Sequence, residues 1–315
     1  MDERRVEVLL ERIAVALERL CIAIEREDVN RSESSPGFPL QNDLKMPSDS
    51  APSSRASEGV PSRLESFLSH RGITIKSVPE KDPSDEIIDS LSVFVGERYD
   101  ALSSILSKIK RAMQTGRMIT ESLKDRSQED ISSTCQFCTR LHEIAFLEQY
   151  KYFRSPTYLI KAKTTTLPKA QRFFGGQWLE RFVLVKSEEI QRQVSSEYGV
   201  DLPFDYLINP QVVLPNGDDF ELDLLIALGN EIYWIEAKSG DYQQHVAKYS
   251  KFSRLLGLDY AHSLMVLTDV PEERCQALSS LFSMTVCNLK TFGNTLQEVF
   301  RSDLQRKVCE AAPVA

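Results

Sequence analysis

The sequence has no long hydrophobic run. Although 42% of its 315 residues are hydrophobic, no stretch approaches the roughly 18 consecutive apolar residues that a membrane-spanning helix needs. Near the N-terminus, charged side chains interrupt the apolar ones throughout, so the apolar centre of a signal peptide is missing as well. We therefore expect a cytoplasmic protein with no membrane partner.

Histidine is scarce, with four residues, and neither a glycine-rich phosphate loop nor a Ser-His-Asp arrangement is recognisable. The six cysteines are scattered, and Cys135 and Cys138 form a lone Cys-x-x-Cys pair with His142 nearby. A structural zinc site needs four ligands. Because free cysteine is among the most buried residue types, we favour packed thiols, with a metal site as the open alternative.

What the sequence does contain is a group of ionisable residues inside two neighbouring apolar runs: Glu221, Asp223, Glu236 and Lys238. Side chains at positions i and i+2 of a strand share a face, so each pair should lie together. Burying such charges is costly unless a partner or a metal compensates. Carboxylate oxygens bind Mg²⁺, often with a substrate phosphate completing the shell, so the group predicts phosphate chemistry. The alternative is a pair of salt bridges at a solvated sheet edge.

The order of these residues resembles the PD-(D/E)xK phosphodiesterase superfamily, which has a restriction-endonuclease-like fold. Asp223 is followed by the Glu-x-Lys sequence at 236–238. Residues 175–180 (GGQWLE) and 238–243 (KSGDYQ) are similar to segments in the nuclease domains of CRISPR-associated ancillary nucleases. The proline that names the motif is absent, since Leu222 precedes Asp223. The resemblance covers about residues 165–300.

The resemblance implies a metal site for Mg²⁺ or Mn²⁺. Asp223 and Glu236 would hold the ion, with the carbonyl of Ala237 as a further ligand and Glu180 bound directly or through water. Glu221 is either an additional carboxylate of this site or an exposed acid that pairs weakly. Glu180 also has a plain alternative as a surface charge of its helix.

The resemblance further implies catalytic roles for two side chains. Lys238 would orient or deprotonate the attacking water and neutralise charge in the transition state, and Gln243 would position the scissile phosphate or the lysine. A lysine suits this role because its pKa shifts readily on burial.

The sequence divides into four regions by composition and periodicity. Residues 1–28 carry a seam of apolar residues at spacings of three and four, which predicts a coiled-coil helix that joins a second copy or another protein. Residues 29–62 are rich in Ser, Pro, Gly and Asp and predict a disordered linker. Residues 63–165 show helical spacing, continuing through 131–150, and predict an all-helical domain or a helical extension of the nuclease core. Residues 166–315 form the nuclease-like domain.

The last region predicts an α/β fold with a mixed sheet flanked by helices. Turn signals at 215–218 and 229–230 favour antiparallel neighbours, and the later strand-helix alternation favours parallel pairing. We expect strands at 207–214, 220–228, 231–238, 263–268 and 284–288, and helices at 241–256, 271–282 and from 289 to about 308.

A basic stretch precedes the predicted active-site helix. Residues 101–172 contain thirteen Lys or Arg and six Asp or Glu, in a chain with net charge −8. Lysine and arginine neutralise phosphates and aromatic rings stack on bases, so this stretch is the candidate nucleic-acid surface; the alternative is a solvated face. The candidate contacts are Lys151, Arg154, Lys161, Lys163, Lys169 and Arg172.

Together these features predict a metal-dependent nuclease that uses water as the nucleophile, with DNA favoured as the substrate. Residues 173–315 are net acidic and the pI is about 5.3, which argues against tight non-specific DNA binding. The alternative is a catalytically silent scaffold of the same fold that oligomerises through residues 1–28 and binds nucleic acid or a protein.

Overall fold

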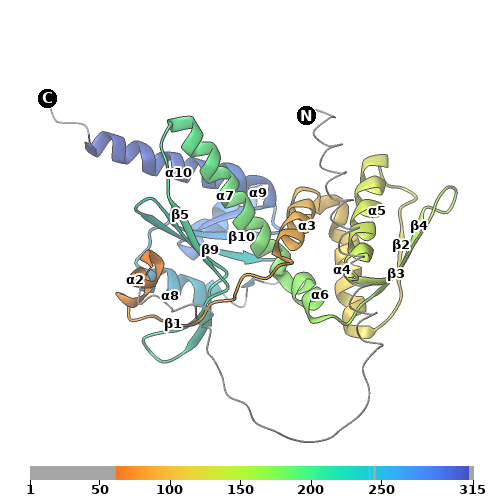
Figure 1. Ribbon diagram of the computed structural model, residues 1–315. Helices are drawn as coiled ribbons and strands as arrows, with labels where there is room; N and C mark the ends of the chain where they lie inside the picture. The colour runs from red at the N-terminus through yellow and green to blue at the C-terminus, as the bar shows by residue number, and fades with distance from the viewer. Residues whose placement is uncertain (1–61, 241, 244–245, 312–315) are drawn as a thin grey trace, which may run out of the picture. The chain divides into compact units, whose positions relative to one another are not determined.

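The computed structural model describes residues 62–240, 242–243 and 246–311 (Figure 1). They belong to one of the two compact units of the chain, Gly59–Ala315. The predicted coiled coil at 1–28 lies outside the described residues, as does the predicted linker at 29–62 except for Ser62. Within the described part of the chain, no helix is both long and apolar enough to cross a membrane.

A five-stranded mixed sheet forms the centre of this unit, with strand order β11-β10-β9-β8-β5. β5, β8 and β9 pair antiparallel, whereas β9, β10 and β11 run parallel. The predicted α/β class and mixed sheet are confirmed. The strands are β5 (Phe204–Ile208), β8 (Leu224–Leu228), β9 (Glu231–Lys238), β10 (Ser263–Leu267) and β11 (Thr285–Asn288).

Helices pack on both faces of this sheet, which explains why β8 and β10 are buried along their whole length. One core cluster joins alternate strand residues such as Ile226 and Tyr233 to α7 and α10, and a second joins Leu225 and Trp234 to α2 and α8. The helices of the unit are α2 (Arg63–Ser69), α3 (Asp85–Glu97), α4 (Tyr99–Thr115), α5 (Gln128–Glu143), α6 (Pro168–Arg172), the π-helical turn η1 (Phe173–Gln177), α7 (Trp178–Tyr198), α8 (Val246–Leu256), α9 (Glu272–Phe282) and α10 (Leu289–Ala311).

Local sequence sets several of these helix ends. Ser62 begins α2 with a capping box, because its hydroxyl accepts from the Glu65 amide while the Glu65 carboxylate accepts from the Ser62 amide. Ser127 caps α5 through its own hydroxyl, which accepts from the amide of Asp130. α4 and α7 both end at a left-handed glycine, Gly116 and Gly199.

The prediction that residues 63–165 are all helical is wrong. Four strands lie there: β1 (Thr74–Ser77), β2 (Ile119–Ser122), β3 (Leu147–Phe153) and β4 (Leu159–Thr164). The helical periodicity expected to run through 131–150 stops at Glu143, and Ala145 follows with a positive φ of 58°. β4 then alternates buried and more exposed residues, which is the period of a strand.

Two predicted strands are each broken into two. The segment 207–214 divides at Asn209-Pro210 into β5 and β6 (Gln211–Val213), and 220–228 divides at Leu222-Asp223 into β7 (Asp219–Glu221) and β8. β6 and β7 leave the central sheet and join β1 in the order β1-β6-β7. The turn signal at 215–218 does join antiparallel strands, as predicted.

Candidate active site

Three of the predicted site residues converge in the interior of the central sheet, where β8 begins and the neighbouring β9 ends. Nζ of Lys238 lies 2.7 Å from Oδ2 of Asp223 and 3.1 Å from Oε2 of Glu236. Asp223 stands in the bend before β8, while Glu236 and Lys238 share one face at the end of β9. The spacing of Glu236 and Lys238 predicted that they share a face, and the β8–β9 pairing brings Asp223 beside them.

The two carboxylates are deeply buried, with exposed fractions of 5% for Asp223 and 1% for Glu236. Hydrogen bonds hold each one: Asp223 Oδ2 accepts from the amide of Ala237 at 2.8 Å, and Glu236 Oε1 accepts from Nε1 of Trp234 at 3.2 Å. Both donors belong to β9, so one strand orients the whole group.

Burial and the nearby carboxylate of Asp223 raise the pKa of Glu236 to about 8. Burial alone would lower the pKa of Lys238, but the carboxylates of Glu236 and Asp223 outweigh it and raise that pKa. The ammonium therefore stays charged, while the site holds more carboxylates than cations.

Glu180 faces this group from the first turn of α7. Burial, followed by repulsion from Asp223, raises its pKa to about 7. Nδ2 of Asn209 donates to Oε2 of Glu180 at 2.8 Å. Sequence reasoning missed Asn209 because it treated 207–214 as one strand. The Asn209-Pro210 dipeptide is a turn signal that could have revealed it.

Gly176 lies where residues 175–180 come close to residues 238–243, the two segments that supported the resemblance. Its φ of 148° belongs to a region that L-residues rarely adopt, and a Cβ there would lie 3.8 Å from Oγ of Ser239 and 4.0 Å from Oε1 of Glu180. Because these distances are ordinary van der Waals contacts, the backbone conformation of the turn before α7, and not a lack of space, requires glycine here. Gly175, its neighbour, has open space around it.

Glu221 does not share a strand face with Asp223, which corrects the prediction from spacing. The chain leaves strand geometry at Leu222-Asp223, and Glu221 is an exposed residue of β7 whose carboxylate accepts from Nε2 of Gln211. Gln243 is exposed in a short turn after β9, between segments that lie outside the described residues. Its assignment to the site stays a prediction.

A cavity of about 870 Å³ opens at Glu180, and Asp223, Glu236 and Lys238 are not among the residues that line it. Glu180, Asn209 and Glu221 line one part of it, and Arg172 and Lys81 lie elsewhere on its wall. Acidic and basic side chains therefore face the same space.

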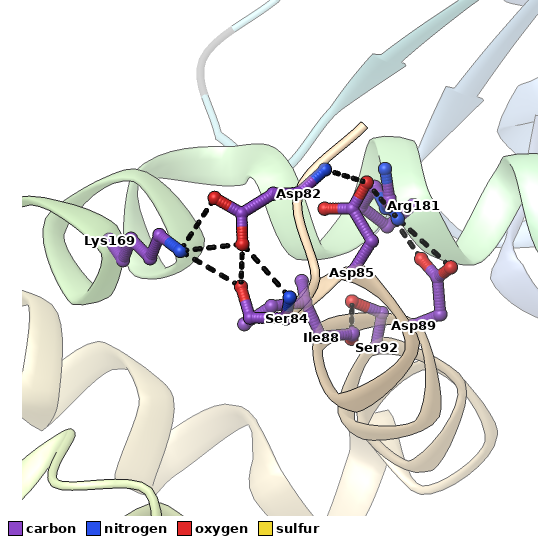
Figure 2. A network of polar contacts seen from close by, with 8 residues as sticks. All are labelled: Asp82, Ser84, Asp85, Ile88, Asp89, Ser92, Lys169 and Arg181. Atoms are coloured by element: carbon purple, nitrogen blue, oxygen red, sulfur yellow. Dashed lines mark hydrogen bonds and ion pairs between the residues drawn. The ribbon is translucent and has the colours of Figure 1, made fainter. Parts of the chain in front are cut away.

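Figure 2 shows that the loop before α3 is attached to α6 through Asp82, and that α3 itself is attached to α7 through Arg181. Lys169 Nζ lies 2.7 Å from Oδ1 of Asp82, and Arg181 forms two hydrogen bonds with Asp89, at 2.5 and 2.9 Å. Arg181 follows Glu180 in α7 and is itself buried. The paired charges thus fix the helix that carries Glu180.

The six predicted nucleic-acid contacts fall into different environments. Lys169 is paired with Asp82, and Lys163 with Glu148 at 2.6 Å. Arg172 lines the cavity. The remaining three are exposed: Lys151 lies on β3, Arg154 at the turn after it, and Lys161 on β4.

The Cys-x-x-Cys pair lies on α5 as free thiols. Cys138 is buried within the apolar core, as the packed-thiol interpretation predicted, and Cys135 is partly buried. Nδ1 of His142 contacts the carbonyl oxygen of Leu147 at 2.9 Å. Among the described residues, no three His, Cys, Asp or Glu side chains are grouped closely enough to hold a metal ion by themselves.

Comparisons with known proteins identify a fold. No protein-family model matches the sequence, and no curated protein matches it significantly. Among solved structures, the chain is similar to protein VC1899 from Vibrio cholerae, with 17% identity and a TM-score of 0.50 over 76% of this chain and 60% of that one. It is also similar to Can2 from Sulfobacillus thermosulfidooxidans, solved with cyclic tetra-adenylate, with 14% identity and a TM-score of 0.48 over 76% of this chain and 62% of Can2. The chain spans less than two thirds of either protein, and the likeness to VC1899 establishes a shared fold.

Proposed function

We propose that this protein is a metal-dependent nuclease that hydrolyses phosphodiester bonds of nucleic acid, with DNA favoured. The observation that carries this proposal is that Nζ of Lys238 lies within 3.1 Å of two buried carboxylates, those of Asp223 and Glu236, at the end of β9. Well-packed apolar residues often stabilise a fold as well as a buried ion pair does, so stability alone is weak grounds for such a group.

The chemistry of the donor set fits Mg²⁺ or Mn²⁺. Asp223, Glu236 and Glu180 supply hard oxygen atoms, with the carbonyl of Ala237 as a further candidate ligand. The raised pKa values of Glu236 and Glu180 reflect burial and repulsion from Asp223, and a cation would relieve that repulsion. Mg²⁺ in particular needs few protein ligands, because water and substrate phosphate complete its shell. When bound, the ion would polarise the phosphoryl oxygen and acidify water.

Lys238 would act on the water and the phosphate, beside the ion held by the carboxylates. Its ammonium contacts both carboxylates, so it is held at the position where negative charge would accumulate on a phosphate. In the proposed reaction it orients the attacking water and stabilises the charge of the pentacovalent transition state. The ring of Tyr249 on α8 also helps to hold this ammonium group, since the ring centre lies 5.6 Å from Nζ of Lys238.

One part of the wall of the cavity at Glu180 is basic and would suit an anionic polymer, although acidic residues outnumber basic ones in the lining as a whole. Arg172 and Lys81 would contact phosphates, while Asn209 fixes the carboxylate of Glu180. The net acidic character of residues 173–315 predicts that binding is weak at this site alone.

Digestion of plasmid, single-stranded DNA and RNA with Mg²⁺ or Mn²⁺ tests the proposal. The wild type should cleave at least one substrate, and EDTA should stop it. Asp223→Asn and Glu236→Gln each replace a carboxyl group that would bind the ion with an amide of the same shape, so each should lower cleavage at least about 100-fold. Cleavage by both variants at the rate of the wild type would refute the assignment.

A catalytically silent scaffold of the same fold is the second candidate. One observation favours it: within the described residues Lys238 occupies the space between the two carboxylates, and no group of three metal ligands is formed. Failure of the wild type to cleave every substrate with either ion would favour this role.

A further inference from the structure

We infer that the open face of the β2–β4–β3 sheet binds a single strand of nucleic acid, away from the residues of the candidate active site. The inference rests on the proposed function and specifies how its substrate is held. The binding face is defined by two lysines, Lys151 and Lys161, together with Phe153 and Leu159, whereas Lys163 lies on the same side of the sheet but is paired with Glu148.

The alternation of the strands creates this face. Ile119, Ile160 and Ala162 point to the other side and are buried against α4 and α5. Figure 1 shows α4 and α5 beside the sheet. Thr120, Lys161 and Lys151 form a row across the three strands, and Ser122, Leu159 and Phe153 form the next row. These six residues are exposed or partly exposed.

Two like charges are placed directly opposite one another on this face. Lys151 of β3 pairs in register with Lys161 of β4, an arrangement that destabilises an antiparallel sheet unless an anion compensates. Both ammonium groups also lie over the ring of Phe153, at 5.1 and 5.7 Å from its centre. The protein thus concentrates positive charge around one aromatic ring.

The described part of the chain supplies no carboxylate partner for these two lysines, nor for Arg154 at the turn. Lys163, on the same face, is different because Glu148 lies 2.6 Å from its ammonium group. The positive charges of this face that could bind a phosphate are therefore those of Lys151 and Lys161, which lie over the ring of Phe153.

The chemistry of this face selects the partner. Ammonium groups neutralise backbone phosphates, and an aromatic ring on an open sheet accepts a base by stacking. A base can stack in this way only when it is unpaired, so the face fits a single strand and not a duplex. A binding surface of this kind would also compensate for weak binding at the acidic catalytic domain.

Fluorescence anisotropy tests the inference with the full chain, in EDTA, using labelled oligothymidylate and a duplex of the same length. The Lys151→Ala/Lys161→Ala variant should raise the Kd for the single strand at least about tenfold. It should also reduce the slope of log Kd against log salt by about 1.4, since each lost contact removes about 0.7. Phe153→Leu should weaken binding about fivefold or more.

Lys163→Ala is the matched control, because it removes a lysine of the same face whose charge is already paired. It should change the Kd less than about twofold. Equal losses in Lys163→Ala and in the double variant would overturn the inference, as would unchanged binding by the double variant or tighter binding of the duplex.

Hydrolysis of bis(p-nitrophenyl) phosphate by the wild type with Mn²⁺ separates this inference from the proposed function. That small diester needs the catalytic group but has no strand to bind. If the diester and the nucleic acids all stay intact while the oligonucleotide results are as expected, the proposed catalysis fails and the binding face stands. If the diester is hydrolysed while the double variant binds the oligonucleotide as the wild type does, the binding face fails and the proposed catalysis stands.

Discussion

Nζ of Lys238 and Oδ2 of Asp223 lie 2.7 Å apart, although the two residues are separated by 15 positions in the sequence. The same oxygen accepts the amide of Ala237. The bend before β8 is therefore fixed to the end of β9 by two donors, and the carboxylate has little freedom to rotate. The ammonium of Lys238 and the backbone of β9 together hold Asp223 in place.

Replacing Lys238 with Met should abolish cleavage, with a loss of at least about 100-fold, because the ammonium that faces the carboxylates is removed. The free energy of unfolding should fall by up to about 3–5 kcal/mol, since two carboxylates are left without a cation. Digestion assays and denaturant unfolding measure the two effects.

Lys186→Met is the matched control for this variant. Lys186 also contacts two carboxylates, Glu97 at 2.9 Å and Glu189 at 2.8 Å, and its side chain is 22% exposed compared with 24% for Lys238. Its loss should cost about 1 kcal/mol or less and leave cleavage intact. Equal loss of cleavage in both variants would mean that the effect of Lys238 is structural.

Gly176→Ala should reduce cleavage and lower the free energy of unfolding by about 1–3 kcal/mol, because φ at this position is 148°. The strain would shift the start of α7 and with it Glu180. Gly175→Ala should be tolerated, since no atom lies within 4 Å of the added carbon. Thermal melts and digestion of both variants check the prediction, which fails if the two substitutions behave alike.

The stability of the protein should fall as the pH rises from 6.5 to 9. Burial lowers the pKa of His262, but Asp303 and Asp259 outweigh it and raise that pKa to about 9 from an ordinary 6.5. Nδ1 lies 2.6 Å from Oδ1 of Asp259 and Nε2 lies 3.2 Å from Oδ2 of Asp303.

Because the folded protein holds this proton more tightly than the unfolded chain, the stabilisation is complete below pH 6.5 and is lost as the pH rises through 9. The loss should amount to about 2 kcal/mol. His262→Gln should remove this part of the pH dependence, measured by urea unfolding at both pH values, while His70→Gln at an exposed site should retain it. Parallel curves for the wild type and His262→Gln would contradict the prediction.

Deleting residues 1–28 should lower the oligomeric state while the remaining chain stays folded. These residues lie outside the described part of the chain, and the prediction depends on their seam of apolar residues. Light scattering measures the mass and circular dichroism checks the fold. An unchanged mass would exclude the seam as the contact between copies.

The sequence alone predicted most of the central sheet. Strong apolar runs indicated β9, β10 and β11 and the helices after them nearly in their true positions, since both faces of these strands are buried and the pattern is unambiguous. The spacing of Glu236 and Lys238 correctly placed both on one face. The strands between 63 and 165 were missed because short strands beside helices leave a weak local signal.

Local sequence determined which residues carry charge and which strands and helices form around them, because burial periodicity and turn chemistry act over a few residues. Only the tertiary structure decided which charges meet. It brought Asn209 to Glu180, removed Glu221 from the face of Asp223, paired Lys163 and Lys169 with acids, and left Lys151 opposite Lys161. These contacts depend on where chain segments far apart in sequence come together, and the spacing of residues does not encode that.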